Sequence, residues 1–285
     1  MRVLLIAHGF PPAAMGGTEI YTHDLGTALM EGFGDEVFVL TREADPEREE
    51  YSVREHERHG MRVFVINNTF GRCTSFADTY RSPAIRAAGA RIIDQVQPDV
   101  AHLQHITCLS TELLEELAQR RIPTFFTLND YWLICHRGQL FDIDLERCPG
   151  PEAGCERCIR GDAGSSPRAY RIARLVRALE RGLPGPLGRA VGRGARAAGR
   201  LFAGRAKAVA EGQRRARHMR RMACHSDLII APSRTLHQRF LDFGIPPSKI
   251  EYVPQGINLK RFSGLQRSTG DRLRIGFFGS MIVSK

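Results

Sequence analysis

The sequence predicts an α/β fold, a Rossmann-like parallel sheet flanked by helices, from two observations. Short apolar runs recur along the chain, and stretches whose apolar residues follow helical spacing lie between several of them. Such alternation is typical of parallel strands joined by crossover helices. The apolar runs span residues 3–7, 36–41, 62–66, 100–103, 124–128, 227–231 and 249–253.

The segments between these runs carry the start and stop signals of helices. The predicted helices span residues 18–30, 82–97, 110–120 and 232–244. Gly34 follows the first of them, and Pro98 and Pro123 stop the next two. Ser233 is expected to cap the last helix through its hydroxyl, which is a structural role.

The composition is that of an ordinary globular protein. The chain has 285 residues, of which 42% are hydrophobic and 25% are charged, enough to bury a sizeable core. Its first ten residues contain one basic residue and a short apolar run, too brief for a signal peptide or a membrane span. We therefore expect a cytoplasmic protein.

The net charge of +10 is concentrated in residues 160–222, which hold 17 Arg and Lys against 3 Asp and Glu. The first part of this segment predicts a helix with separate apolar and basic stripes. Residues 181–200 contain many Gly and Pro, which weaken the helical pattern in this part of the expected helical insertion, residues 160–222. A basic segment on a mildly acidic body favours a local anionic partner such as a membrane surface. The alternative is a solvated, Arg-rich helical insertion.

The first predicted strand is followed by the loop HGFPPAAMGG, residues 8–17. A Gly-rich turn between a strand and a helix places backbone N–H groups and the positive end of the helix dipole at the carboxyl edge of the sheet. Gly16 and Gly17 would let a phosphate or a sugar approach the backbone, and a plain tight turn is the alternative. The loop is not a G-x-G-x-x-G motif and the chain has no P-loop motif, so dinucleotide and P-loop interpretations lose their main support.

Two further strand ends carry polar residues. His102 and His105 follow the apolar pair 100–101, and Asn129 and Asp130 follow the run 124–128. Polar groups at the carboxyl ends of parallel strands are positioned by the sheet while they face a ligand. For either histidine, a packed or surface position is the alternative.

Six motifs, taken in order, resemble the N-terminal half of the family-4 glycosyltransferases, which are retaining sugar-nucleotide transferases of the GT-B fold. The motifs are HGFPPAAMGGTEIYTHDLGTAL, PDVAHLQH, TLNDYW, SDLIIAPS, YVPQGIN and LRIGFFGS. They extend over nearly the whole chain. The resemblance implies an acceptor-side domain at residues 1–265 and the start of a donor-binding domain at residues 271–285.

The resemblance also implies that the Pro-rich loop lies in the cleft between these two domains. Pro11, Pro12, Gly16, Gly17 and Glu19 would lie near the donor diphosphate and the acceptor. The loop would then form one wall of a transfer site, and no metal or other cofactor would be needed for catalysis.

The same resemblance gives roles to the other strand ends. His105 and Asp130 would be catalytic, with Asp130 holding a sugar hydroxyl or activating the acceptor. His102 and Asn129 would bind donor or acceptor, although many relatives have His at the position of Asn129, which leaves its role open. Gln255 replaces the Asn that is usual in the motif VPQGIN, where the family uses the segment for packing and turn geometry.

Four cysteines form a second pattern, C-x12-C-x6-C-x2-C, within residues 135–158. Four thiolates in a short, loop-rich stretch of a cytoplasmic protein favour a structural zinc or iron–sulfur site over disulfides. The ligands would be Cys135, Cys148, Cys155 and Cys158, and free thiols are the alternative. The remaining cysteines, at positions 73, 108 and 224, are expected to be isolated and buried.

The sequence therefore predicts the N-terminal portion of a retaining glycosyltransferase that moves a sugar from a nucleoside diphosphate to a saccharide or lipid-linked acceptor. Because the family binds its donor mostly on the second domain, we expect this chain alone to lack efficient activity. Residues 160–222 would attach the protein peripherally to the inner membrane face.

Two other classes of function compete with this prediction. The first is a non-catalytic, single-domain protein that binds glycan or lipid. The second is a nucleic-acid binder that uses the basic segment. That segment contains only Tyr170 and Phe202 as aromatic residues, too few to stack bases, so we expect no nucleic-acid partner.

Overall fold

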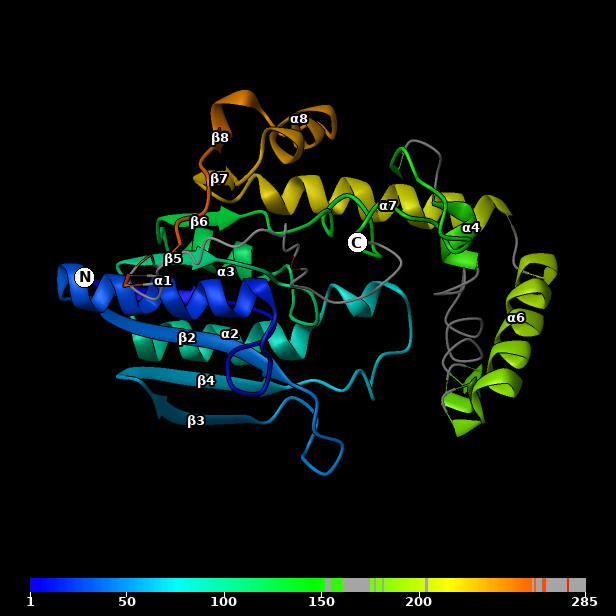
Figure 1. The fold of residues 1–285 in the computed structure, drawn as a ribbon, viewed down its shortest axis with the longest axis horizontal. Helices are drawn as coiled ribbons and strands as arrows, with labels where there is room; N and C mark the ends of the chain where they lie inside the picture. The colour runs from blue at the N-terminus through cyan, green and yellow to red at the C-terminus, as the bar shows by residue number, and fades with distance from the viewer. Residues whose placement is uncertain are drawn as a thin grey trace, which may run out of the picture.

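An eight-stranded sheet organises the part of the chain that this computed structural model describes. That part comprises residues 1–151, 155–160, 175–176, 178–180, 182–202, 205–257, 259, 263–264 and 276. The strands are β1 (Arg2–Ile6), β2 (Glu36–Glu43), β3 (Val53–Arg58), β4 (Met61–Asn67), β5 (Val100–Leu103), β6 (Thr124–Thr127), β7 (Leu228–Ala231) and β8 (Ile250–Tyr252). Their order across the sheet is β3-β4-β2-β1-β5-β6-β7-β8 (Figure 1).

Every neighbouring pair in this sheet is parallel except β3 with β4. The predicted α/β class and Rossmann-like parallel sheet are confirmed, because each predicted apolar run forms a strand. The predicted start of a second domain, residues 271–285, lies outside the described residues apart from residue 276.

Strand β3 was not predicted, because its sequence VREHER contains one apolar residue. It lies at the edge of the sheet, antiparallel to β4, and Arg54 forms an ion pair of 2.7 Å with Glu43 of β2. Charged side chains on an edge strand discourage pairing with another chain. This strand is therefore held by its neighbours rather than by its own hydrophobicity.

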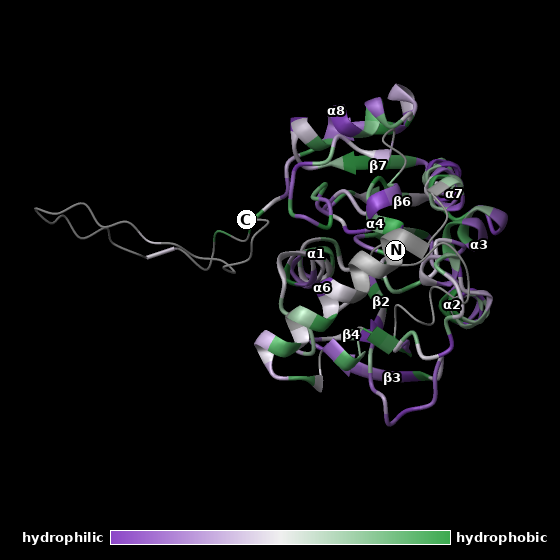
Figure 2. Ribbon diagram, turned by 90° about the vertical axis from the view of Figure 1, so that its right-hand side faces the viewer, coloured by the Kyte–Doolittle hydropathy of each residue, from purple (hydrophilic) through white to green (hydrophobic). Residues whose placement is uncertain are grey.

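Helices cover both faces of the sheet (Figure 2). The helices of the described residues are α1 (Gly17–Phe33), α2 (Pro83–Val96), α3 (Leu113–Gln119), α4 (Glu156–Cys158), α6 (Gly185–Phe202), α7 (Arg205–Ala223) and α8 (Arg234–Asp242). Helix α1 lies on one face, where its apolar side chains pack with Val3 and Leu5 of β1. Helices α2, α3 and α7 lie on the other face, with Leu4 and Ile6, as the alternation of side chains along a strand requires.

The predicted helix ends are present. The Ser233 hydroxyl accepts a hydrogen bond of 3.1 Å from the backbone N–H of Leu236, which confirms its role as the cap of α8. Gly34, with φ of +67°, ends α1 in the left-handed conformation, which glycine adopts at little cost.

Residues 181–200, whose Gly and Pro content weakens the helical pattern, are largely helical, because α6 occupies 185–202. Pro186 lies in the first turn, where the missing N–H costs nothing. A Cβ on Gly188 would lie 2.4 Å from the carbonyl oxygen of Glu180, and one on Gly192 would lie 2.2 Å from the Glu180 carboxylate. These glycines therefore allow close packing against the preceding segment.

The predicted basic insertion, residues 160–222, consists of two different parts. Residues 161–174, 177 and 181, which include all five basic residues of the predicted stripes, lie outside the described residues. Helix α7, in contrast, packs in the main core through five buried side chains, Ala208, Ala216, Met219, Met222 and Ala223. The second part of the segment is therefore a helix of the fold rather than an insertion.

No helix among the described residues is both long enough and apolar enough to cross a membrane.

The contact between α2 and α3 gives a first testable prediction. A Cβ on Gly89 would lie 2.2 Å from Cδ2 of the fully buried Leu113. We expect Gly89→Ala to lower the free energy of unfolding by about 1–3 kcal/mol, as overpacking of a core does. In the control Gly32→Ala, the new methyl group meets nothing within 4 Å, and higher helix propensity should stabilise α1 by up to about 1 kcal/mol. Urea unfolding of both variants would measure this, and equal effects would contradict the close α2–α3 contact.

Candidate functional site

The loop between β1 and α1 is shaped around a buried carboxylate. Glu19, in the first turn of α1, is only 6% exposed. A Cβ on Gly16 would lie 2.4 Å from Oε2 of Glu19, and one on Gly9 would lie 3.1 Å from Oε1. Gly17, in contrast, has nothing within 4 Å of its Cβ position. The Gly-Gly pair thus contains one glycine that the carboxylate requires and one that it does not.

Four polar side chains meet where three neighbouring strands end. His8 follows β1, His105 follows β5 and Asp130 follows β6, while Glu19 comes from α1. Nε2 of His8 lies 3.1 Å from Oε1 of Glu19, and Nε2 of His105 lies 3.1 Å from Oδ1 of Asp130. The rings of His8 and His105 are in contact, with their centroids 4.5 Å apart. We call these four residues the strand-end cluster.

The protonation of the two histidines follows from their surroundings. Burial, reinforced by the neighbouring His105, lowers the pKa of His8 to about 4, so His8 is neutral near pH 7. Nδ1 of His105 accepts a hydrogen bond of 3.1 Å from the backbone N–H of Thr107. A neutral His105 must therefore carry its proton on Nε2, the atom that faces Asp130.

Asp130 is the most accessible carboxylate of the strand-end cluster, with 38% of its side chain exposed. Its Oδ1 also accepts a hydrogen bond of 2.7 Å from the backbone N–H of Trp132. Gly138, with φ of +80°, passes close to Oδ2, where a Cβ would lie only 2.9 Å away. The carboxylate is thus held in place by its loop and still has a face open to a ligand.

The other predicted binding residues have mainly local partners. His102 lies within β5, and its Nε2 is 2.8 Å from the hydroxyl of Thr127 on β6. Burial lowers the pKa of His102 to about 4. His102 therefore lies outside the strand-end cluster, in the packed position that was the alternative for each histidine.

Asn129 connects two segments of backbone. Its Nδ2 donates to the carbonyl oxygen of Gln104 at 2.6 Å, and its Oδ1 accepts from Nε2 of Gln255 at 2.6 Å. The two positions at which the motifs depart from the family pattern therefore contact each other. This bond ties the segment after β8 to the end of β6.

Sequence reasoning missed His8, although it directly follows the first strand. His8 is the first residue of the loop HGFPPAAMGG, but the sequence gives it no role, because its partners Glu19 and His105 become neighbours only after folding. The signal that could have found it is its position, since the ends of adjacent parallel strands meet at one edge of the sheet. Pro12 and Gly17, predicted binding residues, are exposed in the same loop.

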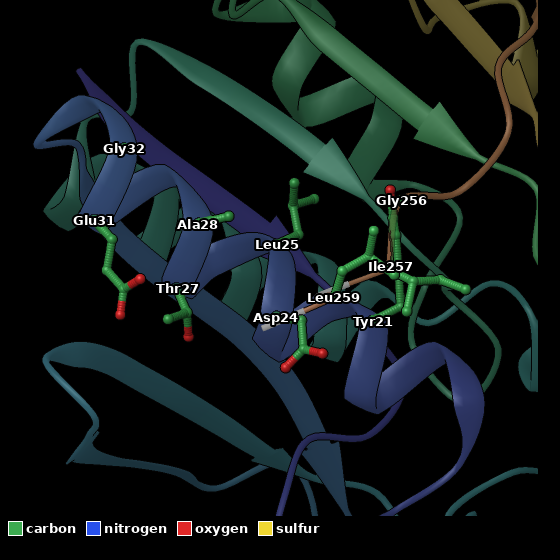
Figure 3. A pocket seen from close by; sticks show the side chains of 10 residues that line it. All are labelled: Tyr21, Asp24, Leu25, Thr27, Ala28, Glu31, Gly32, Gly256, Ile257 and Leu259. Atoms are coloured by element: carbon green, nitrogen blue, oxygen red, sulfur yellow. The ribbon is translucent and has the colours of Figure 1, made fainter. Parts of the chain in front are cut away.

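A hollow beside α1 lies away from this cluster (Figure 3). It has a volume of about 570 Å³ and is formed by one side of α1 and the segment after β8. Its lining includes Tyr21, Leu25 and Ile257, but no member of the strand-end cluster. We place the candidate site at the cluster, because the hollow lacks its paired imidazole and carboxylate groups.

The four predicted metal ligands lie in the loop region near Asp130. Cys135 and Cys158 are buried, and Cys148 and Cys155 are half-buried. Within the described part of the chain, which contains all four, no group of three or more His, Cys, Asp or Glu residues is arranged to hold a metal ion. As they stand, these side chains do not form the expected ligand set, and a metal here stays a prediction.

The other three cysteines differ in their exposure. Cys73 is buried as expected, whereas Cys108 and Cys224 are only half-buried. Cys108 follows the end of β5 in a loop, and Cys224 directly follows α7.

Comparison with known proteins identifies the family. A family model described as glycosyl transferase 4-like domain matches residues 16–256. The chain belongs to the glycosyl transferase 4-like family. The match to this family includes Glu19, His105 and Asp130, and it begins after His8.

Several solved structures resemble this glycosyl transferase 4-like chain. The HepE protein of Anabaena, in complex with UDP and glucose, is 11% identical, with a TM-score of 0.43, and the match covers 91% of this chain and 46% of that chain. Sucrose-phosphate synthase from Thermosynechococcus elongatus is 16% identical, with a TM-score of 0.47, and the match covers 90% of this chain and 49% of that chain. An α,α-trehalose-phosphate synthase from Burkholderia xenovorans, in complex with glucose-6-phosphate, is 9% identical, with a TM-score of 0.43. The match covers 92% of this chain and 51% of that chain. The chain spans about half the length of these proteins, and no curated protein matches it.

The two glycines of the loop provide a matched pair of variants. Gly16→Ala places a methyl group against the buried Glu19 carboxylate, whereas Gly17→Ala meets nothing. We expect Gly16→Ala to lower the free energy of unfolding by about 1–3 kcal/mol and Gly17→Ala to change it by less than about 0.5 kcal/mol. Urea unfolding at pH 7 measures both. A Gly16→Ala protein as stable as the wild type would show that Glu19 does not occupy this position.

Proposed function

We propose that this chain is the acceptor-side domain of a retaining GT-B glycosyltransferase. The enzyme would move a sugar from a nucleoside diphosphate to a saccharide or lipid-linked acceptor. The observation that carries this proposal is the strand-end cluster, in which Asp130 offers an open carboxylate oriented by His105. Membership of the glycosyl transferase 4-like family supports the same conclusion.

In this proposal Asp130 binds the acceptor. Its carboxylate accepts a hydrogen bond from a sugar hydroxyl, while the N–H groups of Trp132 and His105 keep the carboxylate in place. Positioning a hydroxyl against the reacting centre is a major source of rate acceleration in group transfer. No second carboxylate of an inverting mechanism is needed, since retaining transfer relies mainly on stabilising the leaving diphosphate.

The electrostatics at the start of α1 also favour an acceptor role. A helix N-terminus usually attracts anions, but here the Glu19 carboxylate lies over it, close to Gly16. A diphosphate at this position would meet the charge of Glu19 at short range. The hydroxyls of a neutral sugar would instead find a hydrogen-bond acceptor, so we assign the donor phosphates to groups beyond this cluster.

The transfer reaction gives a direct test of the role of Asp130. In the protein expressed from its complete gene, we expect Asp130→Asn to lower kcat/KM on the order of 100-fold, because the amide keeps the shape of the carboxylate and removes its charge. The exposed Glu31→Gln on α1 is the control, with unchanged kinetics. Release of nucleoside diphosphate from UDP- and GDP-sugars, with and without saccharide acceptors, provides the measurement. Full activity of Asp130→Asn would contradict the assignment.

A non-catalytic glycan-binding or lipid-binding protein is the second candidate. It would use the same accessible carboxylate of Asp130 to bind a saccharide hydroxyl. Saccharide binding to the protein expressed from its complete gene, without turnover of any nucleotide sugar, would support this candidate over the transferase.

We also propose that α6 attaches the protein to an anionic membrane surface. Arg189, Arg193, Arg196 and Arg200 recur every three or four residues along this helix, which contains no acidic residue. Figure 1 shows α6 beyond α7, away from the sheet. Each basic residue near an anionic surface contributes about 1 kcal/mol. The arginines at the end of α7 contribute less, because they contact other parts of the fold.

Charge reversal on α6 tests this attachment. We expect the double variant Arg193→Glu/Arg196→Glu to lose most of its binding to vesicles that contain phosphatidylserine, and the wild type to bind them less at high salt. The control is Arg91→Glu/Arg239→Glu, the same charge change at exposed positions on α2 and α8. Vesicle sedimentation compares them. Equal binding to neutral and anionic vesicles, or equal losses in both variants, would contradict an electrostatic contact through α6.

A further inference from the structure

The chain after Asp130 forms a single helical turn that Asp130 itself caps. The backbone N–H of Trp132 donates to Oδ1 of Asp130 at 2.7 Å, and the N–H of Cys135 donates to the carbonyl oxygen of Tyr131 at 2.7 Å. A side-chain carboxylate at the start of such a turn satisfies N–H groups that would otherwise lack partners. The orientation of Asp130 therefore depends on where this turn lies.

A buried arginine from α7 binds the other end of the same turn. Nη2 of Arg215 donates to the carbonyl oxygen of Trp132 at 2.5 Å, and Nη1 donates to the carbonyl oxygen of Leu133 at 3.3 Å. Its guanidinium also lies 5.2 Å from the ring centre of Trp132 and 5.6 Å from that of Tyr80. Asp130 and Arg215 thus hold the two ends of one turn.

Burying the Arg215 side chain beside this turn has a high desolvation cost. Arg215 is only 4% exposed, and no carboxylate among the described residues forms an ion pair with it. Burial lowers its pKa to about 10, so it remains charged near pH 7. A buried charge of this kind is offset only by good hydrogen bonds and contacts with aromatic faces. An apolar side chain could fill the space, but it could not bind two carbonyl oxygens in fixed directions.

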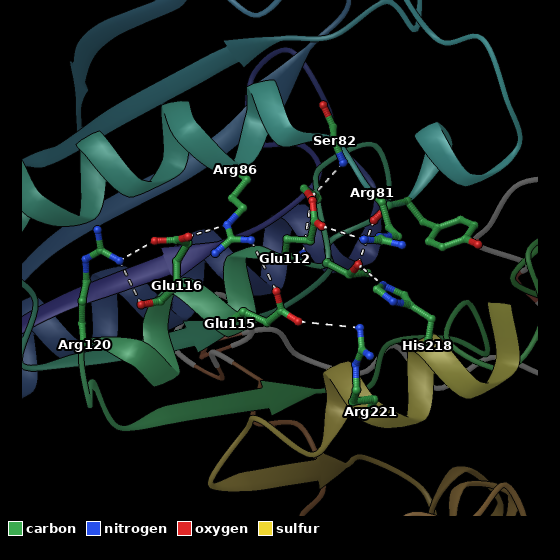
Figure 4. Close-up of polar contacts among 12 residues, drawn as sticks. Arg81, Ser82, Arg86, Glu112, Glu115, Glu116, Arg120, His218 and Arg221 are labelled. Carbon is green, nitrogen blue, oxygen red and sulfur yellow. Dashed lines mark hydrogen bonds and ion pairs between the residues drawn. The ribbon is translucent and has the colours of Figure 1, made fainter. Parts of the chain in front are cut away.

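Helix α7 is itself fixed to the rest of the fold. Nε2 of His218 lies 2.7 Å from the hydroxyl of Thr111, and Arg221 pairs with Glu115 of α3 at 3.8 Å (Figure 4). Glu115 also pairs with Arg86 of α2 at 3.6 Å. Arg215 therefore projects from a helix that is bound directly to α3, which is in turn bound to α2 through Glu115.

We propose that Arg215 is a positioning residue of the candidate transfer site, which holds the turn 131–135 so that Asp130 and Trp132 keep their places beside His105. This inference rests on the function proposed above for Asp130. It gives the last helix of the basic segment a role in the site itself. The ring of Trp132 lies next to that of His105, with their centroids 5.9 Å apart, so a shift of the turn would disturb both.

The single tryptophan of the chain makes the proposal measurable without any substrate. Trp132 is the only tryptophan and is 8% exposed, so its fluorescence reports on this turn alone. The first variant is Arg215→Met, which keeps a long side chain and removes the hydrogen-bond donors. The second is Arg215→Lys, which keeps the positive charge but lacks the planar guanidinium that donates to two carbonyl oxygens. The control is Arg217→Met, an exposed position on the same helix.

We expect both Arg215 variants to show red-shifted Trp132 emission and greater quenching by acrylamide, with unchanged far-UV circular dichroism. In the complete enzyme, kcat should fall at least about tenfold, since small misplacements of reacting groups have large effects, while KM for the donor changes little. Arg217→Met should match the wild type in every respect. If Arg215→Met does not fold, Arg215→Lys alone decides the question.

The proposal is overturned if folded Arg215 variants keep the emission and quenching of the wild type, or if Arg217→Met changes them equally. A loss of thermal stability without any change of Trp132 in the folded protein would also overturn it, because Arg215 would then be merely structural. Absence of transferase activity in the protein expressed from its complete gene would refute the proposed function only, since the fluorescence comparison needs no turnover.

Discussion

The candidate site depends on one buried carboxylate, that of Glu19, beside the neutral ring of His8. This pair explains the glycine at position 16, where a side chain would collide with Glu19, and contributes to that at position 9, where a Cβ would collide with Ala14 and crowd Glu19. It also sets the charge at the start of α1, since the carboxylate takes the position that an anionic ligand would otherwise occupy. The chemistry open to the site, hydrogen bonding to neutral hydroxyls, follows from that arrangement.

The fold assembles the rest of the site from segments that are distant in sequence. Three neighbouring strands bring His8, His105 and Asp130 to one edge of the sheet, on the principle that governs ligand sites in open α/β folds. Support for Asp130 comes from the opposite helix layer, through Arg215 of α7. The edge of the sheet and the helix layer that contains α7 therefore both contribute to the position of the Asp130 carboxylate.

The sequence predicted most of the sheet because parallel strands are buried on both faces and appear as continuous apolar runs. It could not predict β3, which is held at the edge by partners rather than by its own residues. It gave only a weak helical pattern for α6, whose glycines pack closely against Glu180. Glu19, His105 and Asp130 were found through the resemblance and their places after strands. His8 was missed because its partners, Glu19 and His105, lie 11 and 97 positions further along the chain. Arg215 was missed because it reaches the turn after Asp130 from α7. A linear pattern does not contain such contacts.

The measurement that tests the central claim most directly is an NMR titration of the histidine side chains in the wild-type protein. If the strand-end cluster exists as described, His8 will titrate with a pKa of about 4. The ring of His105, when neutral, will carry its proton on Nε2. A His8 that titrates near 6.5, the usual value for an exposed imidazole, would show that the ring is not buried against Glu19 and His105. In that case the proposed acceptor site would lose its structural basis.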